Sequence, residues 1–328
     1  MKKCLPRDGE GISVCFEAKN CANEVSAMRT AAIGIGSNSL RMLIADLQEG
    51  HLHRVERYRA GLRMFAALDE DGNISSEMIE KACSSVEHFR VTAMQEGAEI
   101  VHLFATSAVR DAANQEAFAQ ALYQATGLKL EICSGEEEAS LSFWGAAGSQ
   151  PCGLIDIGGG STEIAIGYLH RIDCSASLQM GAVRLYRQQP IASLEDAKIV
   201  FQTALQILAP HKQSFAQFPK EEWIGVGGTF TTCAALLQRI PWQEKDRIHG
   251  YIITRKALEE AIAYLAPLPL EERLKLPFLQ PQRADIVVHG MVILLACMAD
   301  LKIDAMTVSE CGNLEGYLKA KYMFNAKI

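Results

Sequence analysis

The sequence lacks a segment long enough to cross a membrane, and it lacks the pattern of a secreted protein. Its longest apolar run, IVVHGMVILLACMA, has 14 residues and contains His289, whereas a spanning helix needs about 20. The first 27 residues show no apolar core of a signal peptide. The ten cysteines are scattered, with no C-x-x-C pair and no zinc-type spacing to a histidine. We therefore expect a cytoplasmic protein with reduced cysteines, a buried helix at the apolar run, and a disordered extension without assigned function at residues 1–27.

An excess of positive charge is also missing. The 32 Lys and Arg side chains against 39 Asp and Glu give a net charge of −7. An anionic ligand must then be bound by a local cluster of side chains or by backbone N–H groups, because the field of the whole chain repels it. Neither a nucleic acid nor a membrane surface is expected as a partner.

Two common nucleotide-binding motifs are absent. No G-x-x-x-x-G-K-[ST] loop occurs, which excludes a Walker site. The stretch IGIGSNS at residues 33–39 contains G-x-G, but the residues after it continue as a strand and open no helix. A dinucleotide-binding fold is therefore not expected.

What the chain does contain is a repeat. IDIGGGS at residues 155–161 follows IGIGSNS by 122 positions (156 − 34), with apolar runs on both sides of each turn. Each copy opens a series that reads as three strands joined by tight turns, followed by helices and further strands. We expect helices at residues 75–97, 114–127, 194–209, 231–238 and 314–324. We expect extended segments at residues 222–228 and 305–310, and a loop or a short helical connection at residues 266–282. This duplication predicts two α/β lobes, residues 28–151 and 152–328, which face each other across a cleft.

The glycine-rich turns are the strongest candidates for ligand binding. Three consecutive glycines, Gly158–Gly160, carry an entropic cost that a phosphate cradle would explain, with Ser161 as a hydroxyl donor. The alternative is an ordinary hairpin turn, for which two glycines would suffice. A third turn, IGVGGTF, places Gly227, Gly228 and Thr229 between a strand and a helix. A helix N-terminus there can bind an anion, although a plain connection explains the turn equally well.

Two acids flank the triple-glycine turn. Asp156 and Glu163 could hold Mg²⁺ against phosphate oxygens, because Mg²⁺ binds few carboxylates and keeps several waters. The alternative is a pair of surface carboxylates. Asp156, however, interrupts the apolar run GLIDI, where an unpaired charge would be costly to bury.

A second group of acids opens a helix at SGEEEA. Ser134 and Glu137 fit a capping box, and Glu136 suits the first helical turn. Glu138 precedes the apolar segment SLSFWGA and is a candidate general base, although its position alone favours a structural role. Arg110, in ATSAVRDA, suits a phosphate, a salt bridge with Asp111 or a carbonyl clamp.

Six segments in this order resemble the exopolyphosphatase/guanosine pentaphosphate phosphatase (Ppx/GppA) family of the actin-like ATPase superfamily: IGIGSNSLRML, ATSAVRDA, ICSGEEEASLSFWGA, LIDIGGGSTEI, GVGGTFTTCAAL and RADIVVHGMVIL. The resemblance implies a duplicated actin-like, ribonuclease H-like α/β fold with a central cleft, whose final helix returns to the first lobe. It implies hydrolysis of the terminal phosphoanhydride of inorganic polyphosphate, of pppGpp or of both, with Mg²⁺ as cofactor and a possible homodimer.

The resemblance also implies roles for individual residues. Glu138 falls on the family's catalytic base, Asp156 and Glu163 on its metal-associated acids, and Arg110 on its substrate arginine. The phosphate-binding turns fall on Gly36, Ser37, Asn38, Ser39, Gly158, Gly159, Gly160, Ser161, Gly227, Gly228 and Thr229.

Two departures from the family pattern matter. The sequence has no C-terminal HD-type helical region, so it resembles the short forms and leaves processivity open. Gly34 stands where family members carry aspartate. One alternative is therefore a catalytically impaired sensor that binds polyphosphate or guanosine polyphosphates; a kinase or ATPase on the same fold ranks lower.

Overall fold

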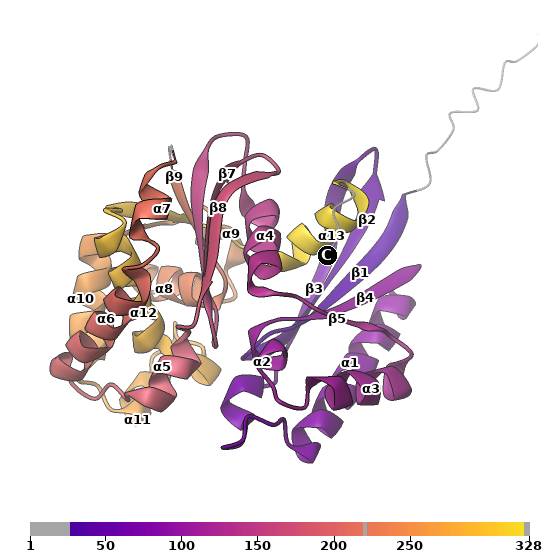
Figure 1. The fold of residues 1–328 in the computed structure, drawn as a ribbon, viewed down its shortest axis with the longest axis horizontal. Helices are drawn as coiled ribbons and strands as arrows, with labels where there is room; N and C mark the ends of the chain where they lie inside the picture. Colours follow the sequence, from indigo (N-terminus) through magenta and orange to yellow (C-terminus); the bar gives the residue numbers. More distant parts are fainter. Residues whose placement is uncertain (1–26, 219–221, 325–328) are drawn as a thin grey trace, which may run out of the picture.

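The computed structural model describes residues 27–218 and 222–324. The extension expected at residues 1–27 thus lies outside the described residues, apart from Ala27. Two lobes stand side by side, each built on one mixed β-sheet with helices on both faces (Figure 1). This arrangement confirms the predicted two-lobed α/β fold.

The first sheet has five strands in the order β3-β2-β1-β4-β5. Strand β1 is antiparallel to β2 and parallel to β4, so the sheet starts with a hairpin and continues with a crossover. The elements of this part of the chain are β1 (Met28–Ile35), β2 (Ser39–Gln48), β3 (His51–Gly61), η1 (Met64–Ala67), α1 (Ser76–Gln95), β4 (Ile100–Ala105), α2 (Ser107–Arg110), α3 (Gln115–Thr126), β5 (Leu130–Ile132) and α4 (Gly135–Ala146).

The second sheet repeats that order as β8-β7-β6-β9-β11 and adds β10 at its edge. Its strands are β6 (Cys152–Ile157), β7 (Thr162–Tyr168), β8 (Arg171–Leu178), β9 (Glu222–Val226), β10 (Ile252–Thr254) and β11 (Ala305–Val308). Its helices are α5 (Ala182–Gln188), α6 (Leu194–Leu208), α7 (Lys212–Ala216), α8 (Gly228–Gln238), α9 (Lys245–Ile248), α10 (Arg255–Leu265), α11 (Leu270–Leu274), η2 (Pro281–Arg283), α12 (Val287–Asp300) and α13 (Asn313–Tyr322). The equivalent strand orders are the structural form of the sequence repeat.

Helices α4 and α13 connect the lobes. Phe143 of α4 packs on the second sheet, whereas Leu314 and Tyr317 of α13, the last helix in the chain, pack on the first sheet (Figure 1). The two helices touch backbone to backbone, because a Cβ atom at Gly145 would overlap the carbonyl oxygen of Gly312, and one at Gly316 would overlap that of Leu141. This contact between α4 and α13 joins the first sheet to the second.

Side-chain alternation decides which strand residues face the site. In β6, Ile155 and Ile157 belong to the main core of the second lobe, whereas Leu154 packs with α4. Asp156 therefore lies on the α4 side of the sheet, since successive residues of a strand point to opposite faces. The apolar run 286–299 forms most of α12, which is buried as expected, and no helix in the described ranges has the length and hydropathy to cross a membrane.

Candidate active site

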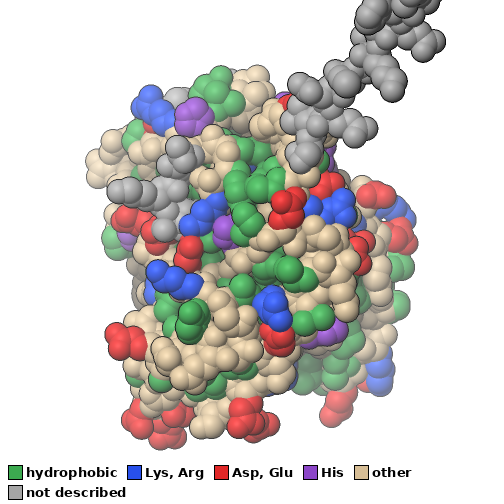
Figure 2. Space-filling view, turned by 90° about the vertical axis from the view of Figure 1, so that its right-hand side faces the viewer, with side chains coloured by type: hydrophobic (Ala, Val, Ile, Leu, Met, Phe, Trp, Pro, Cys, Tyr) green, Lys and Arg blue, Asp and Glu red, His purple; other side chains and the backbone are tan. Residues whose placement is uncertain are grey.

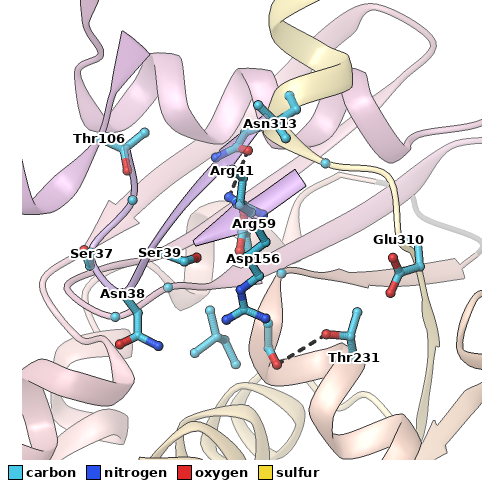
Figure 3. A pocket seen from close by; sticks show the side chains of 18 of the residues that line it. Ser37, Asn38, Ser39, Arg41, Arg59, Thr106, Asp156, Thr231, Glu310 and Asn313 are labelled. Atoms are coloured by element: carbon cyan, nitrogen blue, oxygen red, sulfur yellow. Dashed lines mark hydrogen bonds between the residues drawn. The ribbon is translucent and has the colours of Figure 1, made fainter. Parts of the chain in front are cut away.

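A cavity of about 330 Å³ lies between the lobes, and all three glycine turns contribute to its lining. Figure 3 shows Ser37, Asn38 and Ser39 on one side of it, Thr231 and Glu310 on the other, and Asp156 and Arg59 between them. On the face of the molecule in Figure 2, basic and acidic side chains are interspersed. This face of the molecule therefore presents no uniformly basic surface.

The two hairpin turns have the same local structure. The N–H of Gly36 donates to the carbonyl of Ser39 at 3.0 Å, and the N–H of Gly158 donates to that of Ser161 at 3.0 Å. The turns also touch, because a Cβ atom at Gly159 would lie 2.8 Å from the Cβ atom of Ser37. Gly36 through Ser39, Gly158, Gly159 and Ser161 all line the cavity.

Gly160 is not among the lining residues, although the sequence suggested a phosphate role for it. A Cβ atom at this position would overlap the Ser107 hydroxyl and would lie 2.9 Å from the Phe65 ring. The third glycine is therefore explained by the close packing of the second hairpin on the first lobe.

The third turn behaves similarly. Gly227 and Gly228 line the cavity, and Gly227 has a φ of +87°, a conformation that favours glycine. Thr229 does not line it, because this side chain is buried and its hydroxyl donates to the carbonyl of Ile157 at 3.1 Å. Thr231, two residues further along α8, lines the cavity instead.

The candidate metal acids lie side by side. Asp156 and Glu163 are directly paired in the β6–β7 register, so both side chains project to the same face of the sheet. The Ser142 hydroxyl donates to Asp156 at 2.6 Å, and the Ser177 hydroxyl donates to Glu163 at 2.8 Å. Asp156 lines the cavity; Glu163 is fully buried beside it, and its Oε2 has no hydrogen-bond partner among the described residues.

Glu138 is the acid of the SGEEEA segment that reaches the cavity. Ser134 and Glu137 form the capping box that the sequence predicted, with reciprocal bonds of 3.2 and 2.7 Å, and Glu136 is exposed. Glu138 is only 6% exposed and lines the cavity from the first turn of α4.

All three carboxyl groups have a raised pKa. Burial is the main cause of the raised pKa of Glu138, Asp156 and Glu163. The charges of Glu138 and Asp156 raise the pKa of Glu163 further, and Arg110 partly offsets the rise for Glu138. Three buried acids at one place, with Oε2 of Glu163 lacking a hydrogen-bond partner among the described residues, fit a divalent cation.

The described residues contain no cluster of three or more His, Cys, Asp or Glu side chains arranged to hold a metal ion. Mg²⁺ does not need one, since it binds through one or two carboxylates together with substrate phosphates and waters. The pair Asp156 and Glu163 therefore fits Mg²⁺ better than a metal that requires a closed protein cage.

Arg110 does not line the cavity. Its Nη1 donates to Glu138 Oε2 at 2.9 Å and to the carbonyl of Cys133 at 3.1 Å. The carbonyl clamp considered from the sequence is thus present, and the salt bridge considered with Asp111 is present at 3.7 Å. The closer acidic partner, Glu138, was not expected from the sequence.

Four arginines that no sequence motif indicated also line the cavity: Arg41, Arg57, Arg59 and Arg283. Burial, followed by the neighbouring arginines, lowers the pKa of Arg59 to about 10 and that of Arg283 to about 9. Arg41 lies opposite Arg59 in the β2–β3 register and donates to Asn313 at 3.0 Å (Figure 3). The alternation of Arg57 and Arg59 along one strand was a signal that could have found two of them.

The fold and the site define a two-lobed α/β protein with a cavity between the lobes, lined by glycine turns, arginines and a nearly buried carboxylate. The chain belongs to the Ppx/GppA phosphatase family, whose sequence model matches residues 43–322. It is 31% identical over 309 residues to Exopolyphosphatase 2 of Mycobacterium tuberculosis, covering 88% of this chain and 97% of that one. It is 27% identical to Exopolyphosphatase 1 of Mycobacterium leprae, covering 90% and 89%.

Solved structures agree with this assignment. The Aquifex aeolicus PPX-GPPA enzyme superposes with a TM-score of 0.77 at 28% identity, over 89% of this chain and 99% of that one. An exopolyphosphatase from Cytophaga hutchinsonii superposes with a TM-score of 0.82 over 92% and 99%, at 24% identity, which is similarity of fold.

Proposed function

We propose that the protein hydrolyses the terminal phosphoanhydride of inorganic polyphosphate and releases orthophosphate. The observation that carries the proposal is the position of Glu138, a nearly buried carboxylate at a cavity lined by glycine turns and arginines. The relatives from Mycobacterium tuberculosis and Mycobacterium leprae described above are both named exopolyphosphatases, which supports this substrate.

The residues divide the reaction between them. The N–H groups of the glycine turns bind phosphoryl oxygens, and Arg41, Arg59 and Arg283 balance their charge. Glu138 accepts a proton from the attacking water as the new P–O bond forms and the anhydride P–O bond breaks. The bond electrons leave with the shortened polyphosphate. The raised pKa of Glu138 suits this task, because a general base works best when its pKa is close to the operating pH.

Mg²⁺ is the proposed cofactor, held by Asp156 and Glu163. When bound, it would neutralise part of the charge of the phosphate groups, which is its usual contribution to phosphoryl transfer. The carboxylates also orient themselves without it, through their bonds to Ser142 and Ser177.

Guanosine pentaphosphate (pppGpp) is the second proposed substrate, since it ends in the same phosphoanhydride. The ratio of kcat/KM for the two substrates measures the preference. Phosphate release from either would exclude the alternative of an impaired sensor, for which binding without turnover is expected.

The decisive experiment is a phosphate-release assay with and without Mg²⁺ on the wild type, Glu138→Gln and Glu136→Gln. We expect Glu138→Gln to lower kcat several hundredfold or more, within the range of general-base contributions. Glu136 is a matched control, because it lies in the same helical turn but is exposed and does not line the cavity. An unchanged rate in Glu138→Gln would place the base elsewhere and overturn the proposal.

Two further expectations complete the proposal. A cytoplasmic location agrees with the free cysteines of the described ranges: Cys83, Cys133, Cys152, Cys174, Cys233, Cys297 and Cys311. A homodimer is proposed from the family resemblance, and light scattering on the purified protein tests it.

A further inference from the structure

A row of ion pairs leads from Glu138 to the triple-glycine turn without entering the cavity. Arg110 binds Glu138 at 2.9 Å, and its Nε lies 3.7 Å from Asp111 Oδ1. The other oxygen of Asp111 accepts from Arg184 at 2.5 Å, and Arg184 Nε donates to the carbonyl of Gly160 at 2.6 Å. Arg110, Asp111 and Arg184 are all absent from the cavity lining. We call these three residues the relay.

The relay joins elements that are far apart in the sequence. Arg110 and Asp111 lie at the end of α2 in the first lobe, and Arg184 lies on α5 in the second lobe. Arg184 also places its guanidinium over the Phe65 ring, 4.7 Å from the ring centre. Phe65 packs in turn against Gly160. The relay therefore crosses the contact between the lobes at the point where the second hairpin meets the first lobe.

The side chains of the relay are mostly covered. They are 18%, 24% and 21% exposed, so these pairs are less screened by solvent than ordinary surface pairs. The guanidinium group is a rigid planar fork, and its position fixes the position of the carboxylate oxygen that it holds. Removal of one member takes a charged partner from each of its neighbours in a partly covered position.

We propose that Arg110, Asp111 and Arg184 are positioning residues that align Glu138 with the triple-glycine turn of the opposite lobe. This inference rests on the proposed function, in which Glu138 is the general base. It differs from the substrate-binding role that the family resemblance implies for Arg110. In this structure Arg110 is already occupied by Glu138 and by the carbonyl of Cys133, and a phosphate would have to displace that carboxylate.

The test compares kcat and KM for polyphosphate in Arg110→Met, Arg110→Lys, Asp111→Asn and Arg184→Met, with thermal unfolding as a check on folding. We expect Arg110→Met to lower kcat about 100-fold with KM within about twofold of wild type, since a small misplacement of a catalytic group costs that much. Arg110→Lys should recover about a tenth of the lost rate or more. Asp111→Asn and Arg184→Met should each lower kcat about tenfold. The Asp111→Asn/Arg184→Met double variant should lose no more activity than the more impaired of the two single variants.

Arg187→Met is the matched control. Arg187 lies one turn after Arg184 on α5 and also crosses to the first lobe, where it donates to the carbonyls of Phe65 and Leu68 at 3.1 and 3.3 Å. It has no contact with the relay in those bonds, and we expect its kcat to stay within twofold of wild type. An equal loss of kcat in Arg187→Met would mean that only general packing between the lobes matters, and would overturn the inference.

Two other results would also overturn it. A KM raised tenfold or more in Arg110→Met at unchanged kcat would make Arg110 a substrate ligand. Strictly multiplicative losses in the Asp111→Asn/Arg184→Met double variant would show that the pairs do not act as one unit. If Arg110→Met fails to fold, Asp111→Asn and Arg184→Met carry the test. Failure of the proposed function is recognised separately, because the wild type would then release no phosphate or Glu138→Gln would keep the wild-type rate.

Discussion

Gly34 and Arg41 face each other across the first hairpin at the two positions where the second hairpin carries Asp156 and Glu163. Both pairs are directly opposite in their registers, and the corresponding residues are 122 positions apart (156 − 34 and 163 − 41). The backbones of the two hairpins close with the same hydrogen bond. The first lobe thus presents a cation at the position where the second presents a pair of acids.

The two connecting helices differ in the same way. At the start of α4 Glu137 forms a capping box with Ser134, and at the start of α13 the Glu315 carboxylate accepts from the N–H of Gly312 at 3.0 Å. The next residue is Glu138 in α4 and Gly316 in α13, where a Cβ atom would overlap the carbonyl of Leu141. The two halves of the duplicated chain therefore share their backbone structure but carry different side chains at equivalent positions. The first hairpin supplies Arg41 at the position where the second hairpin supplies an acid, Glu163.

Among the tests of this comparison between the two hairpins, the largest expected effect comes from neutralising the acids of the second hairpin. Asp156→Asn and Glu163→Gln should each lower Mg²⁺-dependent phosphate release at least 100-fold and should weaken Mn²⁺ binding in a titration, because Mn²⁺ and Mg²⁺ use oxygen ligands alike. Glu222→Gln, an exposed acid on β9 of the same sheet, is the control. Wild-type metal affinity in both acid variants would show that the second hairpin is not the metal-binding half.

The next effect tests the cationic half. Arg41→Gln should raise KM about tenfold or more and change kcat less, since a hydrogen bond to a charged group contributes about 1.5–3 kcal/mol. Arg54→Gln is the control, because Arg54 lies on β3 but pairs with Glu315 and does not line the cavity. A loss confined to kcat would contradict a binding role for the first hairpin.

A smaller effect is expected when the missing acid is introduced. In Gly34→Asp the new Cβ atom would lie 2.9 Å from the Phe104 ring, which stacks on Tyr317 at 4.6 Å. We expect a loss of about 1–3 kcal/mol in the free energy of unfolding, the usual cost of overpacking, and no gain in turnover. Gly61→Asp, with open space around Gly61, is the control for thermal unfolding. A stable Gly34→Asp variant with strongly raised turnover would show that this glycine limits catalysis, as the sensor alternative requires.

The smallest effect on activity concerns the lobe cores. His289 of α12 is fully buried beside Tyr186, Arg273 and Asp285, and burial lowers its pKa to about 4. Helices α1 and α3 of the first lobe carry a single histidine, His88, which is exposed.

Because the folded-state pKa of His289 is below the unfolded value, the unfolded chain binds the proton more strongly. The contribution of neutral His289 to the free energy of unfolding is therefore fully present above about pH 6.5. It is lost as the pH falls towards 4, by up to about 3 kcal/mol. In His289→Gln this part of the pH dependence should vanish from denaturant unfolding curves, with activity at pH 7 unchanged. The same acid dependence in the variant would assign it to other groups.

Much of the fold could be predicted because it is encoded locally. The three-strand openings of both lobes and the helices α1, α3, α6, α8, α12 and α13 follow from apolar periodicity and turn residues. Helix α10 was missed although Leu258, Ala261, Ile262 and Leu265 have helical spacing. Strand β10 has three residues and exists through its pairing with β11, some 50 positions later in the chain, so no local pattern reveals it.

The candidate site was predictable where backbone chemistry dictates the residue type. Glycines at turns, acids in apolar runs and a capping box all leave a signature in a few consecutive positions. The arginines of the cavity leave a weaker sequence signature, because Arg41, Arg59 and Arg283 come from three separate elements. Local sequence does not distinguish the lining residues from Gly160, Thr229 and Arg110. Each of these three contacts a residue distant in the sequence and does not line the cavity.

By itself, then, the sequence determined the duplicated lobes, the three glycine turns and the acids beside them, since these depend on conformational preferences and periodicities within short segments. Only the tertiary structure decided which of those residues reach the cavity and which partners hold the others. The reason is that these contacts, such as Arg184 with Asp111 or Gly159 with Ser37, join positions more than 70 residues apart. Their geometry arises when the two sheets and the helices between them pack together.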